Sequence, residues 1–126
     1  MESVVERFLR YVTFDTQSDE ESDTCPSTEK QKALAAALVE EMRGMGIADA
    51  RMDENGYVYG TVPGDLELPI IGLIAHMDTA PDASGANIKA KVVAYDGGDV
   101  CLNEEKGIFL READYSYLKN HVGKHL

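Results

Sequence analysis

The sequence has few basic residues, and this shortage excludes one class of partner. Twelve Lys and Arg residues stand against 23 Asp and Glu, which gives a formal net charge of −11 over 126 residues. No cluster of basic residues interrupts the acidic composition, so a polyanion would be repelled and we expect no nucleic-acid partner. The composition is typical of the surface of a soluble cytosolic protein.

Targeting signals and long apolar runs are also lacking. Residues 1–7 interleave charged and apolar side chains, without the basic start and unbroken apolar stretch of a secretion signal. No apolar run approaches the length of a membrane span. We therefore expect a cytoplasmic location and no membrane partner.

Cysteine is scarce. Cys25 and Cys101 lie far apart, and neither has a CxxC or histidine spacing around it. Two reduced thiols are the favoured interpretation for a cytoplasmic protein, and a disulfide is the alternative.

The apolar content, 44% of the sequence, is sufficient for one ordinary domain. Helical spacing of apolar residues predicts a helix over residues 3–13. Thr28-x-x-Gln31 has the form of a capping box at the start of a second helix, which Gly44 and Gly46 would end. The apolar stripe of this helix, expected in the core, consists of Leu34, Ala37, Leu38, Met42 and Met45.

Several segments have the composition of β-strands. Residues 51–53 and 57–62 predict a hairpin, because the Asn-Gly pair between them supplies the positive backbone angles of a tight turn. The apolar run over residues 68–75 predicts a strand buried on both faces of a sheet. Short strands are expected at 91–95 and 107–110, with a helix or a pair of turns at 112–121. The pattern predicts one compact α/β domain or part of one.

His76 and Asp78 directly follow the apolar run. In open α/β sheets, functional groups gather beyond the carboxyl ends of the strands. Neutral imidazole is a common zinc ligand, and it usually donates its other ring N–H to a carboxylate that fixes its orientation. Two residues apart in extended backbone, the two side chains point to the same side. A histidine satisfied by an aspartate without any metal is the alternative that these residues leave open.

Longer stretches of the chain resemble one family. Residues 72–85, Gly-Leu-Ile-Ala-His-Met-Asp-Thr-Ala-Pro-Asp-Ala-Ser-Gly, closely resemble the first metal-site motif of the peptidase T aminopeptidases, which are zinc enzymes of the M20 metallopeptidase kind. Further blocks resemble the same family in the same order, at residues 11–18, 26–31, 55–64 and 95–103. Several blocks in register are more specific than one metal motif.

The resemblance implies an α/β fold, in which residues 1–126 form the N-terminal part of an M20-type catalytic domain with a mixed sheet flanked by helices. It also implies a parent enzyme that releases the N-terminal residue of tripeptides with two zinc ions. His76 matches a metal ligand, and Asp78 matches the catalytic aspartate that orients it. The remaining ligands, the catalytic glutamate and the lid or dimerisation domain are expected beyond Leu126. The chain alone is therefore expected to bind zinc weakly at most and to be inactive.

Other candidate ligands are weaker. Glu104 and Glu105 precede the expected bridging aspartate, whereas the glutamate pair of the family follows it, so solvent-facing acids are favoured. His121 and His125 have an i, i+4 spacing that could hold a metal. Gly123 between them and the lack of a nearby carboxylate favour exposed histidines.

Three aspartates lie in glycine-containing loops. Asp82, Asp96 and Asp99 are typical of turns, and Asp82 is also a candidate to line the cleft.

Two other functions remain open from the sequence. One is a related M20 dipeptidase, carboxypeptidase or deacylase, and the other is a non-catalytic module that binds a peptide or a partner. Continuation of the gene into a Gly-Ala-Asp-Asp segment would support the enzyme, and a stop codon would support the module. Because strand edges and apolar surface would be left uncovered, we also expect copies of the chain to form a homo-oligomer.

Overall fold

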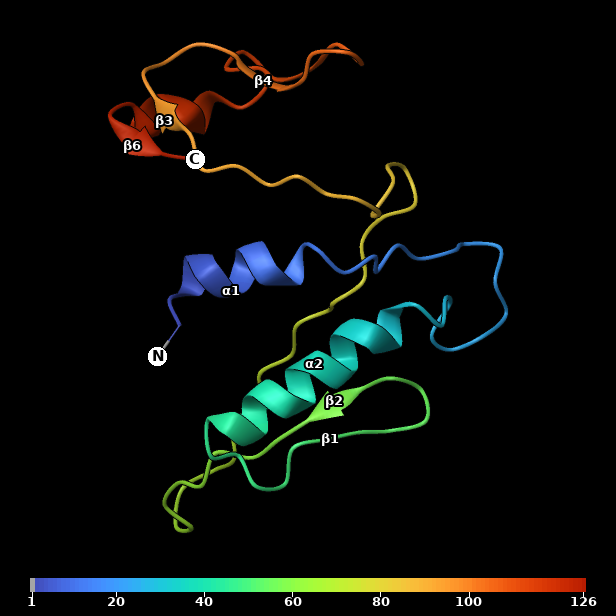
Figure 1. Cartoon of the computed structure of the whole chain (residues 1–126). Coiled ribbons are helices and arrows are strands. Elements are labelled where there is room, and N and C mark those ends of the chain that lie inside the picture. Colours follow the sequence, from blue (N-terminus) through green and yellow to red (C-terminus); the bar gives the residue numbers. More distant parts are fainter. Residues whose placement is uncertain (1) are drawn as a thin grey trace. The chain divides into compact units, whose positions relative to one another are not determined.

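The helices and strands of the computed structural model, which describes residues 2–126, fall into two units divided after Lys89 (Figure 1). The first unit holds α1 (Val4–Tyr11), α2 (Gln31–Gly44), β1 (Arg51–Met52) and β2 (Val58–Tyr59). The second holds β3 (Ala94–Tyr95), β4 (Val100–Asn103), β5 (Ile108–Leu110), the 3-10 helix η1 (Ser116–His121) and β6 (Lys124–His125). The strands form three antiparallel pairs, β1-β2, β3-β6 and β4-β5. The expected mixture of helices and strands is confirmed, but residues 2–126 do not build a single mixed sheet.

Both expected helices form, and their starts differ in chemistry. Ser3 caps α1 by accepting a hydrogen bond from the Glu6 amide at 3.2 Å, and Glu6 accepts one from the Ser3 amide at 2.6 Å. The capping box expected at the start of α2 is wrong, because Lys30 is the N-cap residue and provides no side-chain cap. The Thr28 hydroxyl instead donates to the Gln17 carbonyl at 2.8 Å.

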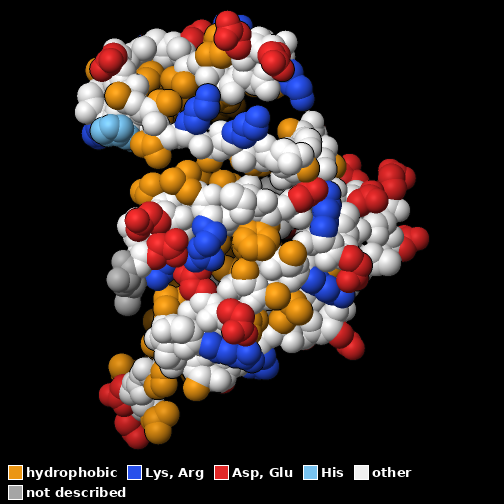
Figure 2. Space-filling model, in the orientation of Figure 1, with side chains coloured by type: hydrophobic (Ala, Val, Ile, Leu, Met, Phe, Trp, Pro, Cys, Tyr) orange, Lys and Arg blue, Asp and Glu red, His pale blue; other side chains and the backbone are white. Residues whose placement is uncertain are grey.

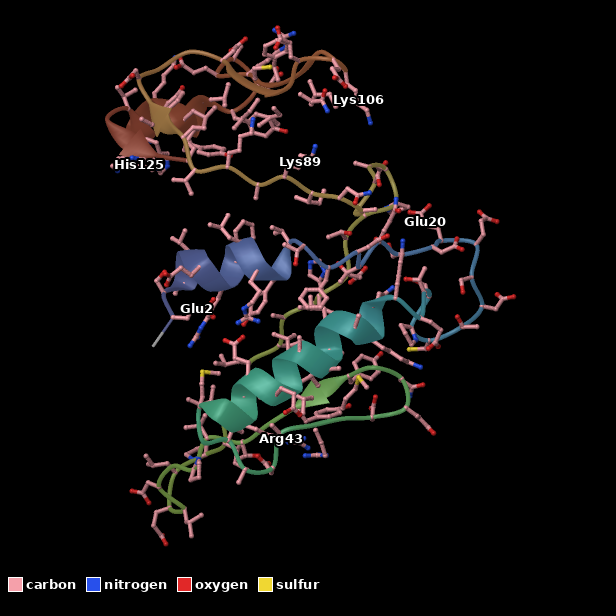
Figure 3. The ribbon with its side chains drawn as sticks, in the orientation of Figure 1. Glu2, Glu20, Arg43, Lys89, Lys106 and His125 are labelled. Atoms are coloured by element: carbon pink, nitrogen blue, oxygen red, sulfur yellow. The ribbon has the colours of Figure 1, made fainter. Side chains whose placement is uncertain are left out.

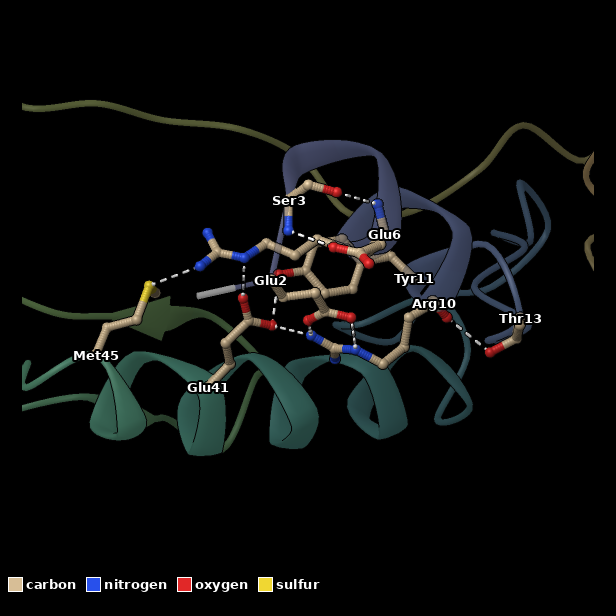
Figure 4. Close-up of polar contacts among 9 residues, drawn as sticks. Glu2, Ser3, Glu6, Arg10, Tyr11, Thr13, Glu41 and Met45 are labelled. Carbon is tan, nitrogen blue, oxygen red and sulfur yellow. Dashed lines mark hydrogen bonds and ion pairs between the residues drawn. The ribbon is translucent and has the colours of Figure 1, made fainter. Parts of the chain in front are cut away.

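A polar cluster joins α1 to α2 (Figure 4). The carboxylate of Glu41 on α2 accepts hydrogen bonds from Arg10 and from the Tyr11 hydroxyl, and Arg7 Nε lies 2.9 Å from Glu41 Oε1. The guanidinium of Arg10 and then the Tyr11 hydroxyl lower the pKa of Glu41 below its ordinary value. These ion pairs and hydrogen bonds therefore connect α1 to α2.

The core of the first unit is small. α2 packs on the β1-β2 hairpin and buries Leu34, Ala35 and Val39, while Ala50 is buried just before β1. Met45 is 43% exposed, so its predicted core position is wrong, because it follows the last residue of α2. α1 has no buried residue, and its apolar side chains remain accessible.

The hairpin predicted around Asn55 forms with shorter strands than expected. Arg51 pairs with Tyr59, and Met52 pairs with Val58. The carboxylate of Asp53 accepts the amides of Asn55 and Tyr57 at 3.0 and 2.9 Å, so a side chain organises the turn.

The buried strand predicted at residues 68–75 is wrong. These residues have no strand hydrogen bonds, and Ile70 and Ile74 are 98% and 99% exposed. A strand satisfies its backbone groups only beside another strand, and none of the described residues pairs with this run. Figure 2 shows hydrophobic side chains on the surface of the loop that protrudes at the bottom of the view, which by its colour in Figure 1 leads into this run. The run therefore has the apolar composition of a buried strand, but the described residues contain no strand that pairs with it.

The second unit is held around Tyr95. Its ring is buried, and its hydroxyl oxygen lies 2.8 Å from the Gly98 carbonyl oxygen and 3.0 Å from Glu112 Oε2. The strands predicted at 91–95 and 107–110 form as the shorter β3 and β5, and residues 112–121 form turns and then η1. Lys106 lies at the turn between β4 and β5, away from this core (Figure 3).

Candidate functional site

His76 and Asp78 lie together, as the spacing predicts. Nδ1 of His76 is 3.1 Å from Asp78 Oδ1 and 3.0 Å from the Asp78 carbonyl oxygen. Both partners are acceptors, so this nitrogen carries the ring proton and the Nε2 lone pair is left available. The two side chains are 84% and 41% exposed. The pair therefore has the geometry of an oriented imidazole ligand, and it is open to solvent.

The backbone next to this pair is anchored to residues near the N-terminus. Thr79 makes a parallel bridge with Gln17, in which its amide donates to the Thr16 carbonyl at 3.1 Å and its carbonyl accepts from the Ser18 amide at 2.9 Å. The Ser18 hydroxyl also donates to that carbonyl at 2.9 Å. Thr16 is buried at the centre of the contact. The residue that directly follows Asp78 is thus held on both backbone groups.

The loop that continues from Thr79 is held by a side chain. Nε2 of Gln17 donates to the carbonyls of Pro81 and Ala83 at 2.9 and 3.0 Å. The sequence analysis did not identify Gln17 as a functional residue. The available signal was its place in the block at residues 11–18 that resembles the peptidase T family.

Asp15 stiffens the same contact from the other side. Its carboxylate accepts the Gln17 amide at 3.1 Å and lies 2.9 Å from Lys30 Nζ. The Lys30 ammonium, and then the Gln17 amide, lower the pKa of Asp15. Gly85 is buried against this carboxylate, and a Cβ added there would lie 2.8 Å from Asp15 Oδ1. A side chain at this position would therefore displace the Asp15 carboxylate.

The pair borders a cavity of about 1410 Å³ within the first unit. Its walls include apolar side chains of α2 and of the exposed run, among them Leu34, Leu38 and Leu73. Asp82 is exposed and lines the same cavity, as expected for a residue of the cleft. The cavity offers an apolar wall with a few polar groups at one side, which is typical of ligand sites.

The remaining candidates do not join the pair. Glu104 and Glu105 are exposed between β4 and β5, in agreement with the sequence analysis. His121 belongs to η1 and His125 to β6, so the two rings do not share a helical face. Asp99 accepts the Glu112 amide at 2.9 Å, a contact between residues 13 apart in the sequence.

The fit to a zinc site is therefore partial. His76 is suited to be one ligand, with Asp78 as its orienting carboxylate. Within residues 2–126 there is no group of three or more His, Cys, Asp or Glu side chains that could hold a metal ion. A catalytic zinc usually takes three protein ligands, so no catalytic step can be derived from these residues alone.

Two smaller expectations concern the cysteines and the helices. Cys25 and Cys101 are free, as favoured. No helix in the described part of the chain is long and apolar enough to cross a membrane.

Known proteins match this chain along its whole length. It is 53% identical over 131 residues to Peptidase T of Alkaliphilus oremlandii (strain OhILAs) and 54% identical over 129 residues to Peptidase T of Desulfitobacterium hafniense (strain Y51), with all of the chain covered in both. Over its whole length, the chain is similar to proteins named Peptidase T. Peptidase T of Geobacillus thermodenitrificans (strain NG80-2) is 48% identical over 97% of the chain. No protein-family model matches the chain.

The matches with Peptidase T cover only part of each relative. The chain spans 32%, 31% and 30% of the lengths of these three proteins. The blocks from which the family resemblance was drawn all lie within the matched region, so the resemblance is confirmed for the chain as a whole.

Proposed function

We propose that this chain supplies the first metal half-site of a zinc-dependent aminopeptidase that acts in the cytoplasm and releases the N-terminal residue of tripeptides. The observation that carries the proposal is the His76–Asp78 pair, in which Nδ1 faces the carboxylate at 3.1 Å and Nε2 remains available beside the cavity. The identity of about 50% to proteins named Peptidase T supports a peptidase.

The roles of the two residues follow from their chemistry. Nε2 of His76 would bind one of two zinc ions, and Asp78 would hold the imidazole in the tautomer that binds metal. Zinc would supply a Lewis acid for the peptide carbonyl and lower the pKa of a bound water. Asp78 would accept the hydrogen bond from Nδ1–H and keep the ring from rotating away from the metal.

The chain alone is expected to be inactive, because one ligand does not build a catalytic zinc centre. We expect weak zinc binding at most and no hydrolysis of tripeptides by the purified 126-residue chain. Measurable release of N-terminal residues by this chain would refute the half-site assignment.

A chimera tests the proposal. In Peptidase T of Alkaliphilus oremlandii, this chain would replace the 131 aligned residues, and zinc content and tripeptide hydrolysis would be measured. His76→Ala should abolish hydrolysis and reduce bound zinc, and Asp78→Asn should lower zinc affinity or activity by about 10 to 100-fold. His121→Ala serves as the matched control, because His121 lies in the second unit and should leave both unchanged. Full zinc content and activity in the His76→Ala chimera would overturn the proposal.

A further inference from the structure

The segment from Asp15 to Ser18 is a second element of the candidate site, separate in sequence from the His-x-Asp motif. This segment contacts the residues that follow the motif. Its backbone bonds to the backbone of Thr79, and the side chain of Gln17 bonds to the carbonyls of Pro81 and Ala83. The partners are 61 to 66 residues apart. We call this set of contacts the Gln17 clamp.

The clamp acts on the pair through one peptide unit. The His76 ring bonds to the carboxylate and to the carbonyl oxygen of Asp78, and that carbonyl belongs to the peptide whose amide is Thr79 N. Thr79 N donates to the Thr16 carbonyl at 3.1 Å. The orientation of the imidazole is therefore tied to the position of Thr79.

Gln17 is the residue of the clamp whose side chain reaches farthest along the loop. Its side-chain amide donates to the carbonyls of Pro81 and Ala83, and its backbone carbonyl accepts a hydrogen bond from the Thr28 hydroxyl at 2.8 Å. A side-chain amide offers two N–H donors, so one residue can hold two carbonyls of an irregular loop. Glu at this position would place a carboxylate against two carbonyl oxygens.

We propose that Gln17 is a positioning residue, which keeps the His76 imidazole in its Nδ1–H tautomer by holding the Thr79–Ala83 backbone. The inference rests on the proposed function only in treating the pair as a metal half-site. The clamp itself is a claim about the 126-residue chain and can be tested on it directly.

The test uses NMR of the full, isotope-labelled chain in mildly alkaline buffer. Ring nitrogen shifts report the His76 tautomer, and hydrogen exchange reports the Ser18 and Thr79 amides. In Gln17→Glu, and in the uncharged Gln17→Met, we expect a mixture of tautomers and at least about tenfold faster exchange at both amides. Asn55→Asp is the control for added charge, because Asn55 is exposed at the turn between β1 and β2 and takes no part in the Gln17 clamp.

The outcomes separate the two claims. An unchanged His76 tautomer in both Gln17 variants would overturn the positioning role, even if the thermal midpoint fell, because lower stability alone does not select a tautomer. If both variants and the control behave as expected, the positioning role stands whatever the chimera shows. Failure of the proposed function would be recognised separately, because the His76→Ala chimera would then keep its full zinc content.

Discussion

Glu41 shows how a single side chain can join two elements. The Glu41 carboxylate on α2 interacts with Arg7, Arg10 and Tyr11 of α1 (Figure 4). Its side chain is only 13% exposed. Exposed ion pairs contribute little to stability, but a cluster in which one carboxylate serves several donors is more favourable. Because α1 has no buried residue, this charge cluster is a main attachment of α1.

We expect Glu41→Gln to lower the free energy of unfolding by about 1 kcal/mol at neutral pH. The folded pKa of Glu41 lies below its ordinary value of 4.5, so its contribution is present above that value and is lost as pH falls through the folded pKa. The difference between wild type and variant should therefore shrink below pH 4.5. Urea denaturation at several pH values measures it. Glu40→Gln is the control, since Glu40 pairs only with Arg43 of its own helix at 3.0 Å. A difference that stays constant down to pH 3 would contradict the assignment.

At the scale of elements, the sequence was informative where structure is local. The helices at 3–13 and after Thr28, and the hairpin around Asn55, depend on periodicity and turn chemistry within a few residues, and all three form. The run at 68–75 was mispredicted because a strand depends on neighbours that periodicity does not encode.

The candidate site divides in the same way. The His76–Asp78 contact spans two residues and could be predicted from spacing. The Gln17 clamp could not, because its hydrogen bonds join a side chain to carbonyls more than 60 residues away and leave no periodic pattern.

The packing of α2 on its hairpin makes a prediction at Gly60. A Cβ added there would overlap the methyl end of Met42 and lie 2.8 Å from Ile47 Cγ2. We expect Gly60→Ala to destabilise the chain by about 1 kcal/mol, since the flexible methionine can move but the isoleucine must shift as well. The urea midpoint measures the effect. Gly64→Ala is the matched control, because nothing lies within 4 Å of its added Cβ. Equal stability of the two variants would show that the space beside Gly60 is open.

For the whole molecule, the exposed apolar run sets the expected association state. Residues 68–77 carry no Asp, Glu, Lys or Arg, so this segment can meet its counterpart in a second copy without the repulsion expected from a net charge of −11. We expect two copies to associate by pairing these segments as strands, which would satisfy their backbone groups and cover their side chains.

Sedimentation velocity over a range of concentrations tests this association. The wild-type chain should show a concentration-dependent dimer, and the double variant Ile71→Lys, Ile74→Lys should remain monomeric. Val62→Lys is the control, because Val62 is 77% exposed but lies outside the run. A wild-type chain that stays monomeric at the highest concentration would rule out association through this segment.

The bridge between Gln17 and Thr79 also has a consequence for folding kinetics. It closes a loop of about sixty residues, whereas the α1 cap and the β1-β2 hairpin close loops of only a few. Loop closure costs entropy that increases with length, and contacts of large sequence separation are slow to form. During synthesis, the anchor of the half-site can assemble only after the chain has been extended past residue 79. We therefore expect His76 to adopt its fixed orientation at the rate at which the loop between Gln17 and Thr79 closes. This rate should be nearly independent of the helix propensity of α1.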